Sequence, residues 1–353
     1  MDSDIVDAKM SLQENHGVCG VDEHRECLHI NQIIVRNRLV LPPMATAKAA
    51  EGGRVTDELC EYYAERAKYG GFGLIIAEHS YIHPQGRASV GQLSMAENAD
   101  IPGLRRMTDA IHPYGVSVFA QISHAGGMTN SKVTGEWPVA PSAVLMSNRA
   151  DAQVPREITA EEIHQIPNLF AQAALRAKEA GFDGVEIHSA HGYLLNQFYS
   201  PITNRRADAY GAQTMENRVR LHVETIRAVR SAVGAAYPIA IRLGGCDYRD
   251  GGSTIADCVE ACRIFEQEGV DLIDLSGGLC GFMRPDRKND PGYFSDMSSA
   301  VKKAVCTPVL LTGGIQMPSQ AEALIRDGAA DLIGVGRAAY QNAHWADETS
   351  ALR

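Results

Sequence analysis

The residues best suited to chemistry follow one short apolar run. His188, His191 and Tyr193 come directly after the segment Val185 to Ile187, whose β-branched composition predicts a strand. Two imidazoles and a phenol gathered at one strand end need hydrogen-bond partners if they are buried, and a bound substrate can supply them. Barrel enzymes carry their catalytic side chains at such strand ends, so this segment is the first candidate for an active site.

A second group of residues has the composition of a phosphate site. Gly313-Gly314 and Gly336-Arg337 each follow a predicted strand, and the second pair leads into a helix. Bare backbone N–H groups, a helix N-terminus and one guanidinium commonly bind phosphate in barrels, and a glycine has no Cβ to hold the phosphate away. The alternative is that the glycines only turn the chain. Because both loops carry the same features, we expect a phosphorylated ligand.

An arginine at the end of an apolar strand predicts an anion nearby. Arg242 lies at the end of the run 238–243 and must meet a negative group in or beside a cavity. That group is a ligand or, as the alternative, the carboxylate of Glu78 at the end of an earlier predicted strand. The other predicted strand ends carry Pro43, Met44, Ala45, His79, Gln121, His124 and Ser276.

The elements that position these residues alternate between strand and helix. Helices begin at Thr56, at a capping box of Thr159 with Glu162, and at Thr254. This alternation, without the GxGxxG turn of a dinucleotide-binding sheet, predicts an α/β protein with a closed (β/α)8 TIM barrel. The predicted strands span residues 36–44, 73–78, 116–122, 183–188, 238–243, 271–276, 308–314 and 331–337.

A single barrel domain is expected over residues 28–353. An N-terminal hairpin over 28–35 plugs its floor, and residues 1–27, which lack periodicity, form a mobile extension. The longest interruption, residues 124–158 after the third strand, is rich in Gly, Pro, Ser and Asn. Long excursions of this kind commonly wall or cover a functional pocket.

Composition narrows the choice of partner. The chain of 353 residues has a formal net charge of −10, which disfavours nucleic acid and anionic membranes, and its opening lacks the features of a secretory signal. We expect a cytoplasmic protein that acts on a small molecule. The eight cysteines show no zinc-binding spacing, and no helix carries the pair His79 and His83, so no metal site is predicted.

These residues resemble the Old Yellow Enzyme family of FMN-dependent ene-reductases, in its bacterial NADH:flavin oxidoreductase branch. The resemblance runs from about Leu28 to Asn342. Its most specific motifs are EIHSAHGYLLNQF with SPITNRRADAYG and ENRVR, then RNRLVLPPM, QISHAG, and TGGI paired with GVGR.

The resemblance implies that FMN lies across the barrel mouth. Pro43, Met44 and Ala45 would line one side of its ring. Gln121 would hydrogen-bond the pyrimidine edge, and Arg242 would favour negative charge on the reduced ring. The other cofactor-binding residues would be His188, Ser276, Gly313, Gly314, Gly336 and Arg337, the last four around the phosphate.

The same likeness assigns catalytic roles. His188 and His191 would polarise the substrate carbonyl, and Tyr193, a phenol with an ordinary pKa near 10, would protonate the α-carbon. The implied reaction is ping-pong: NADH or NADPH reduces the flavin and leaves, and an α,β-unsaturated carbonyl compound (enone) then takes hydride at its β-carbon. Two alternatives stay open, namely a flavin-dependent amine dehydrogenase or desaturase on the same barrel, and a flavin-binding protein without catalysis.

Several features depart from the family pattern. Ala45 replaces a frequent Thr or Cys, and Gly127 replaces the arginine of an HAGR motif, which leaves the shape of the 124–158 excursion open. Ala45 and Ala47 make that wall small, which predicts a bulkier or polycyclic enone. Larger relatives add an iron–sulfur cluster and a second nucleotide-binding domain; this chain has no clustered cysteines, so we expect electrons to come directly from nicotinamide. A homo-oligomer is expected by analogy with relatives.

Overall fold

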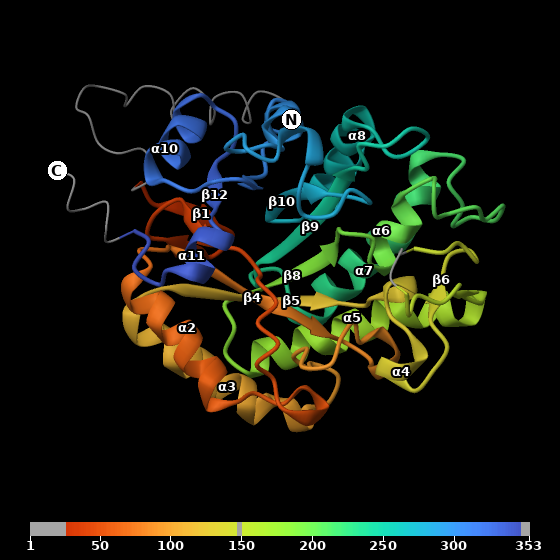
Figure 1. The fold of residues 1–353 in the computed structure, drawn as a ribbon, viewed down its shortest axis with the longest axis horizontal. Coiled ribbons are helices and arrows are strands. Elements are labelled where there is room, and N and C mark those ends of the chain that lie inside the picture. The colour runs from red at the N-terminus through yellow and green to blue at the C-terminus, as the bar shows by residue number, and fades with distance from the viewer. Residues whose placement is uncertain (1–25, 147–149, 347–353) are drawn as a thin grey trace.

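The computed structural model of the chain describes residues 26–146 and 150–346, and within them the closed barrel is confirmed (Figure 1). The predicted extension over 1–27 lies outside the described residues except for its last two. Eight parallel strands close on themselves because the last pairs with the first as well as with its predecessor. The barrel strands are β3 (Leu39–Leu41), β4 (Leu74–Tyr81), β5 (Ser117–Ser123), β8 (Gly184–Ser189), β9 (Ile239–Cys246), β10 (Leu272–Gly277), β11 (Val309–Thr312) and β12 (Leu332–Gly334).

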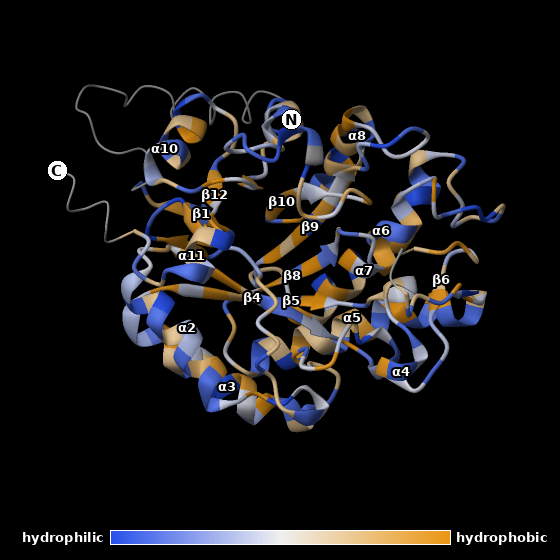
Figure 2. Ribbon diagram, viewed as in Figure 1, coloured by the Kyte–Doolittle hydropathy of each residue, from blue (hydrophilic) through white to orange (hydrophobic). Residues whose placement is uncertain are grey.

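The strands bury both of their faces, which explains their near-continuous apolar sequences. In β4, Leu74 and Ile76 join the cluster that fills the lower barrel, whereas Ile75 and Ala77 pack in the larger cluster shared with the helices. Figure 2 shows the hydrophobic colour concentrated on the strands at the centre of the molecule. Because the lower interior is filled with side chains, polar groups find room only toward the carboxyl ends of the strands.

The helices form the outer layer, and their starts agree with the sequence prediction. Thr159 with Glu162 and Thr254 with Asp257 each form a capping box, in which side chain and backbone exchange hydrogen bonds. No helix in the described ranges is long and apolar enough to cross a membrane. The helices beside the barrel are α2 (Asp57–Tyr69), α3 (Ile101–Ile111), α5 (Ala160–Glu179), α7 (Met215–Val233), α8 (Ile255–Gln267), α9 (Ser295–Lys302), α10 (Pro318–Arg326) and α11 (Arg337–Gln341).

The predicted hairpin closes the floor of the barrel. Strands β1 (Leu28–Ile30) and β2 (Ile33–Val35) pair antiparallel, and Ile30 and Val35 are buried in the cluster that fills the lower barrel. At the hairpin turn, the side-chain amide of Asn31 donates to the carbonyl of Ala235 (2.9 Å) and to Asp271 Oδ1 (3.0 Å). These contacts hold the plug against the loops at the lower end.

The long excursion after β5 has some regular structure of its own. It contains the short helix α4 (Ser131–Thr134) and a parallel pair formed by β6 (Val139–Ala140) and β7 (Arg156–Glu157). A Cβ at Gly127 would lie 3.0 Å from the side chain of Met146 and 3.1 Å from that of Pro155. A larger side chain at this position would therefore require these neighbours to shift.

Candidate active site

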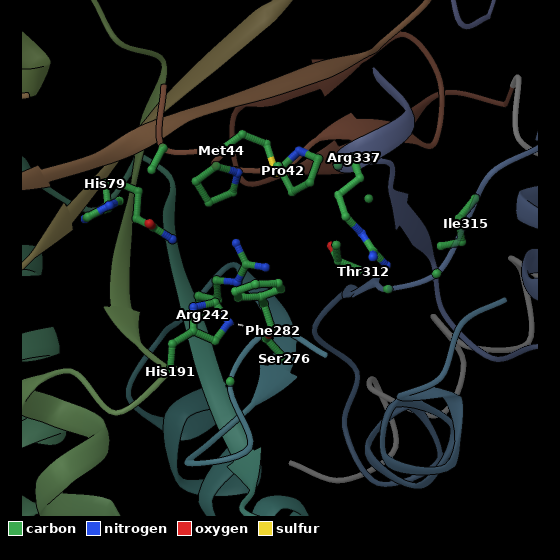
Figure 3. Close-up of a pocket in the computed structure, with 18 of the residues that line it drawn as sticks. Pro42, Met44, His79, His191, Arg242, Ser276, Phe282, Thr312, Ile315 and Arg337 are labelled. Atoms are coloured by element: carbon green, nitrogen blue, oxygen red, sulfur yellow. Dashed lines mark hydrogen bonds between the residues drawn. The ribbon is translucent and has the colours of Figure 1, made fainter. Parts of the chain in front are cut away.

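A cavity of about 850 Å³ opens at the carboxyl ends of the barrel strands (Figure 3). The structure brings every site residue predicted from the sequence to its walls, which is the placement that a parallel barrel dictates. The predicted residues that line the cavity are Pro43, Met44, Ala45, Gln121, His188, His191, Tyr193, Arg242, Ser276, Gly313, Gly314, Gly336 and Arg337.

The end of β8 and the turn after it hold the two imidazoles and the phenol against one another. The ring centroid of His188 lies 5.3 Å from that of His191 and 4.9 Å from that of Tyr193. His191 has a left-handed backbone (φ 59°), which is uncommon for a residue other than glycine, and Gly192 follows with φ 77°. This turn brings the side chains on either side of it to the same cavity.

Two buried amides support the turn from behind. Oδ1 of Asn196 accepts a hydrogen bond from the Gly192 N–H (2.8 Å). Nε2 of Gln197 donates to the carbonyls of Gly192 (2.6 Å) and Ala125 (3.0 Å). Both amides belong to the short helix α6 (Leu194–Tyr199), so the motif HGYLLNQ carries the supports of its own turn.

Burial sets the protonation states of these groups. Burial, together with the charge of Arg242, lowers the pKa of both His188 and His191 well below its usual value, so both rings are neutral at neutral pH. Burial raises the pKa of Tyr193, and the phenol keeps its proton. Nε2 of His191 lies 2.7 Å from Ser276 Oγ, while Nδ1 of His188 is buried with no partner among the described residues. Such neutral imidazoles can donate hydrogen bonds to a substrate oxygen.

Arg242 lies in the cavity floor beside a carboxylate that the sequence reading did not suggest. Its Nε lies 3.2 Å from Oδ2 of Asp274, the residue in register with it on the neighbouring strand β10. The two atoms form an ion pair whose alignment does not make a hydrogen bond. The suggested alternative partner, Glu78, instead accepts a hydrogen bond from the Thr46 N–H (3.1 Å).

A second buried carboxylate completes the floor. Oε1 of Glu186 accepts a hydrogen bond from Gln121 Nε2 (2.7 Å), and both Glu186 and Asp274 are 0% exposed. Burial and the charge of Asp274 raise the pKa of Glu186 well above its usual value, and burial raises that of Asp274 to about 6. The other Glu186 oxygen and both Asp274 oxygens have no donor among the described groups. We infer that the two carboxyl groups share one proton.

The opposite end of the cavity suits an anion. Arg337 forms no ion pair with a carboxylate in the described ranges, and Oγ1 of Thr312 is buried without a hydrogen-bond partner there. Figure 3 shows these two residues together, across the cavity from His79 and His191. A guanidinium without a counter-ion beside a buried hydroxyl without a partner is an arrangement that a phosphate completes.

The glycines at this end are required by packing within the protein. A Cβ at Gly313 (φ 143°) would lie 2.6 Å from the Tyr293 ring, and one at Gly314 (φ 70°) would lie 2.4 Å from the Asp290 carbonyl oxygen. The packing of the chain after β10 therefore already requires glycine at both positions. The glycines remain compatible with a phosphate, but they are not specific evidence for one.

The residues present fit FMN. The cation and hydroxyl just described would hold its phosphate, and the apolar run Pro42 to Ala45 would line its ring. Arg242 and Gln121, both on the floor, would meet its polar edge, where partners for a guanidinium and an amide are needed. In the described residues no group of three or more metal-ligating side chains comes together.

Several residues that line the cavity received no role from the sequence. His79 and Thr312 lie at predicted strand ends and line the cavity from β4 and β11, but the strand-end rule alone does not say what they do. Glu186 and Asp274 are charged residues inside apolar strands, which was a usable signal. Phe282 and Tyr293 belong to the connection after β10, where no motif or periodicity marks them.

Comparison with known proteins agrees with this geometry. Residues 26–351 match the NADH:flavin oxidoreductase / NADH oxidase family. The chain is 40% identical over 322 residues to an NADH oxidase of Thermoanaerobacter brockii, covering 90% of this chain and 49% of that protein, and so spans about half of that relative. It is 36% identical over 317 residues to an NADPH dehydrogenase of Geobacillus sp. (strain WCH70), covering 90% of each.

The fold comparison gives the same result. The structure of the Old Yellow Enzyme homologue from Zymomonas mobilis matches with a TM-score of 0.82 at 26% identity, covering 94% of this chain and 93% of that one. The family match covers every described residue, and the structural match includes the barrel that carries the cavity. The chain thus belongs to the NADH:flavin oxidoreductase / NADH oxidase family, with the Old Yellow Enzymes.

Proposed function

We propose that the protein is an ene-reductase that saturates the C=C bond of α,β-unsaturated carbonyl compounds with electrons from NADH or NADPH. The observation that carries this proposal is the convergence of two neutral imidazoles, His188 and His191, with a protonated phenol, Tyr193, on one cavity. Bound FMN supplies the redox chemistry by accepting a hydride from the nicotinamide and passing it to the substrate.

The protein side chains orient and polarise the substrate. Hydrogen bonds from His188 and His191 to the carbonyl oxygen draw electron density away from the β-carbon, which prepares that carbon for the hydride. When Ser276 donates its hydroxyl proton to Nε2 of His191, the ring proton of His191 lies on Nδ1 and is free for the substrate. Although neutral, both rings can donate hydrogen bonds, and these bonds stabilise the negative charge that develops on the carbonyl oxygen.

Tyr193 completes the reaction with a proton. Hydride at the β-carbon and the Tyr193 proton at the α-carbon together give the saturated ketone, and the phenolate regains its proton from water. Because burial raises the pKa of this phenol, it remains protonated while it waits for the substrate. Arg242 and Gln121, positioned by the two floor carboxyl groups, act on the cofactor side.

The experiment is anaerobic turnover by the FMN-loaded protein. We expect NADH or NADPH to be consumed when 2-cyclohexenone is added, with cyclohexanone as the product. Consumption that requires oxygen and leaves 2-cyclohexenone unchanged would refute the proposal and favour an oxidase. A flavin protein that consumes no nicotinamide under either condition would refute it in favour of a binding protein.

The substrate size is a separate part of the proposal. Ala45 makes one part of the cavity wall small, which supports a bulky cyclic enone, whereas Ala47, the other small residue predicted for that wall, is not among the residues that line the cavity. Rates with 2-cyclohexenone and with a steroid-sized enone, measured at matched concentrations, test this point. A clear preference for the small ring contradicts the proposed size but leaves the reaction itself intact.

A further inference from the structure

A third imidazole, that of His79, shares the substrate end of the cavity with the catalytic groups. Its ring centroid lies 5.5 Å from that of Tyr193, at an interplanar angle of 65°, and 6.3 Å from that of His188. Figure 3 shows His79 on the side of the cavity away from Arg337 and Thr312. The proposed reaction, as described so far, gives this ring no task.

The surroundings of His79 fix which ring nitrogen carries the proton. The Ala88 backbone N–H, which can only donate, makes a 2.6 Å hydrogen bond to Oε1 of Gln92 and so sets the orientation of that amide. Nε2 of Gln92, 2.8 Å from Nδ1 of His79, must therefore be the donor of that pair. The same amide nitrogen also donates to the His79 carbonyl (3.2 Å). Nδ1 is thus an acceptor, and the proton of the neutral ring lies on Nε2.

The charge of the ring follows from its environment. Burial, and to a smaller extent the charge of Arg242, lowers the pKa of His79 to about 4, so the ring is neutral at neutral pH. Nε2 makes no hydrogen bond within the described part of the chain, and the residue lines the cavity. His79 therefore presents one N–H donor to whatever occupies the space beside Tyr193.

This arrangement argues against two other tasks for His79. A proton relay to Tyr193 would need Nδ1 to receive a proton while Nε2 gives one, and the Gln92 amide has none to give. A ring that only packs generally has both nitrogens satisfied by the protein. His79 instead lines the cavity with Nε2 unpartnered among the described residues, so this N–H is available to a ligand.

We propose that His79 is a specificity residue that donates a hydrogen bond from Nε2 to a second acceptor oxygen of the substrate, besides the carbonyl held by His188 and His191. This inference rests on the proposed function and deepens it. The substrate class it predicts is an enone with a further carbonyl, such as a cyclic ene-dione. An acceptor that enters the cavity beside an unused N–H gains a hydrogen bond, and a ring with only CH groups there leaves the donor unpaired.

The test compares two substrates in three forms of the FMN-loaded protein. The substrates are 2-cyclohexene-1,4-dione, with two carbonyl oxygens, and 2-cyclohexenone, with one. His79→Phe keeps an aromatic ring and removes the donor, whereas His79→Gln restores an amide N–H near the position of Nε2. Because the dione is intrinsically the better hydride acceptor, the quantity compared is the effect of each substitution on each substrate.

We expect His79→Phe to lower kcat/KM for the dione about tenfold, the cost of one lost hydrogen bond, and to change it less than about twofold for 2-cyclohexenone. His79→Gln should recover most of the loss. Equal effects on both substrates, or no effect on either, would overturn the proposal. A shifted visible spectrum of ligand-free His79→Phe would also overturn it, because the N–H would then meet the flavin ring.

Binding without turnover separates this inference from the proposed function. Dissociation constants of the dione and of 2-cyclohexenone for the oxidised protein, titrated through flavin absorbance, need no nicotinamide. If the wild type reduces neither compound, the reductase proposal fails, and selective loss of dione binding in His79→Phe still supports the donor role. If the wild type reduces both but His79→Phe weakens the binding of both equally, only the role of His79 fails.

Discussion

Asp274→Asn should destabilise the protein far more than Glu186→Gln, although each removes one buried carboxyl group. Asp274 is the ion-pair partner of Arg242 (3.2 Å), and both side chains lie in the barrel floor. Removing that partner leaves a buried guanidinium without its counter-charge, which costs about 3–5 kcal/mol. Because Glu186 carries the shared proton, glutamine replaces one neutral donor and acceptor with another and costs less than about 1 kcal/mol.

The pH dependence of the free energy of unfolding is a second test of the shared proton between Glu186 and Asp274. Burial holds the pKa of Glu186 above its value in the unfolded chain, so the unfolded chain releases this proton at lower pH than the folded one does. The free energy of unfolding of the wild type therefore falls as pH rises through that window. Glu186→Gln has no such proton, so its stability relative to the wild type should increase steadily above pH 6, where Asp274 is largely ionised.

Urea unfolding at a fixed FMN concentration measures both effects, and fixed ligand matters because bound flavin adds to the apparent stability. Equal losses in the two variants at pH 7 would show that both carboxyl groups are ionised and would refute the shared proton. A stability difference between Glu186→Gln and the wild type that does not change with pH would refute it independently.

Three further predictions concern the two ends of the cavity. Tyr193→Phe should slow reduction of an enone by about 100-fold or more and leave reduction of the flavin by NADPH unchanged, because only reduction of the enone needs the phenol proton. Stopped-flow measurement of each half-reaction decides this, and equal slowing of both would contradict it. Arg337→Met should weaken FMN binding by about 10–100-fold, because it removes a charge-assisted contact with the phosphate. The control is Arg326→Met on α10, whose arginine pairs only loosely with Asp327 (3.8 Å) and which should leave FMN binding unchanged. A fluorescence titration measures both. Gly313→Ala should lower the melting temperature with or without FMN, because its Cβ would lie 2.6 Å from the Tyr293 ring. A melting temperature lowered only when FMN is present would show that the cofactor, and not the packing, requires glycine here.

The barrel and the position of the site were predictable from the sequence for a physical reason. Parallel strands buried on both faces have continuous apolar runs, and capping boxes such as Thr159 with Glu162 mark where helices begin. Once the order of strands is known, the carboxyl ends must surround one cavity, so the residues at those ends meet. Local pattern therefore determines both the elements and the edge at which they gather.

Partners across strands were not predictable in the same way. Arg242 pairs with Asp274 rather than Glu78 because β9 and β10 run side by side in a register that places these two residues opposite each other. In the same way, the register between β5 and β8 places Gln121 opposite Glu186, to which it donates a hydrogen bond. Register depends on how all the strands tilt and close, and one strand's sequence does not carry it.

The protonation states together make the substrate end of the cavity rich in donors but almost without net charge. His79, His188 and His191 are neutral because burial lowers the pKa of each, and the charge of Arg242 is matched by Asp274. A carboxylate entering this end would lose its hydration without gaining an unmatched cation, whereas a carbonyl oxygen loses little and gains the imidazole donors. The unmatched cation in the cavity, Arg337, lies at the other end. This division assigns the anionic tail of the cofactor and the neutral carbonyl of the substrate to opposite ends of one cavity. The oxidised protein should therefore bind 2-cyclohexenone more tightly than 1-cyclohexene-1-carboxylate. Tighter binding of the carboxylate would show that the charge of Arg242 is not matched by Asp274.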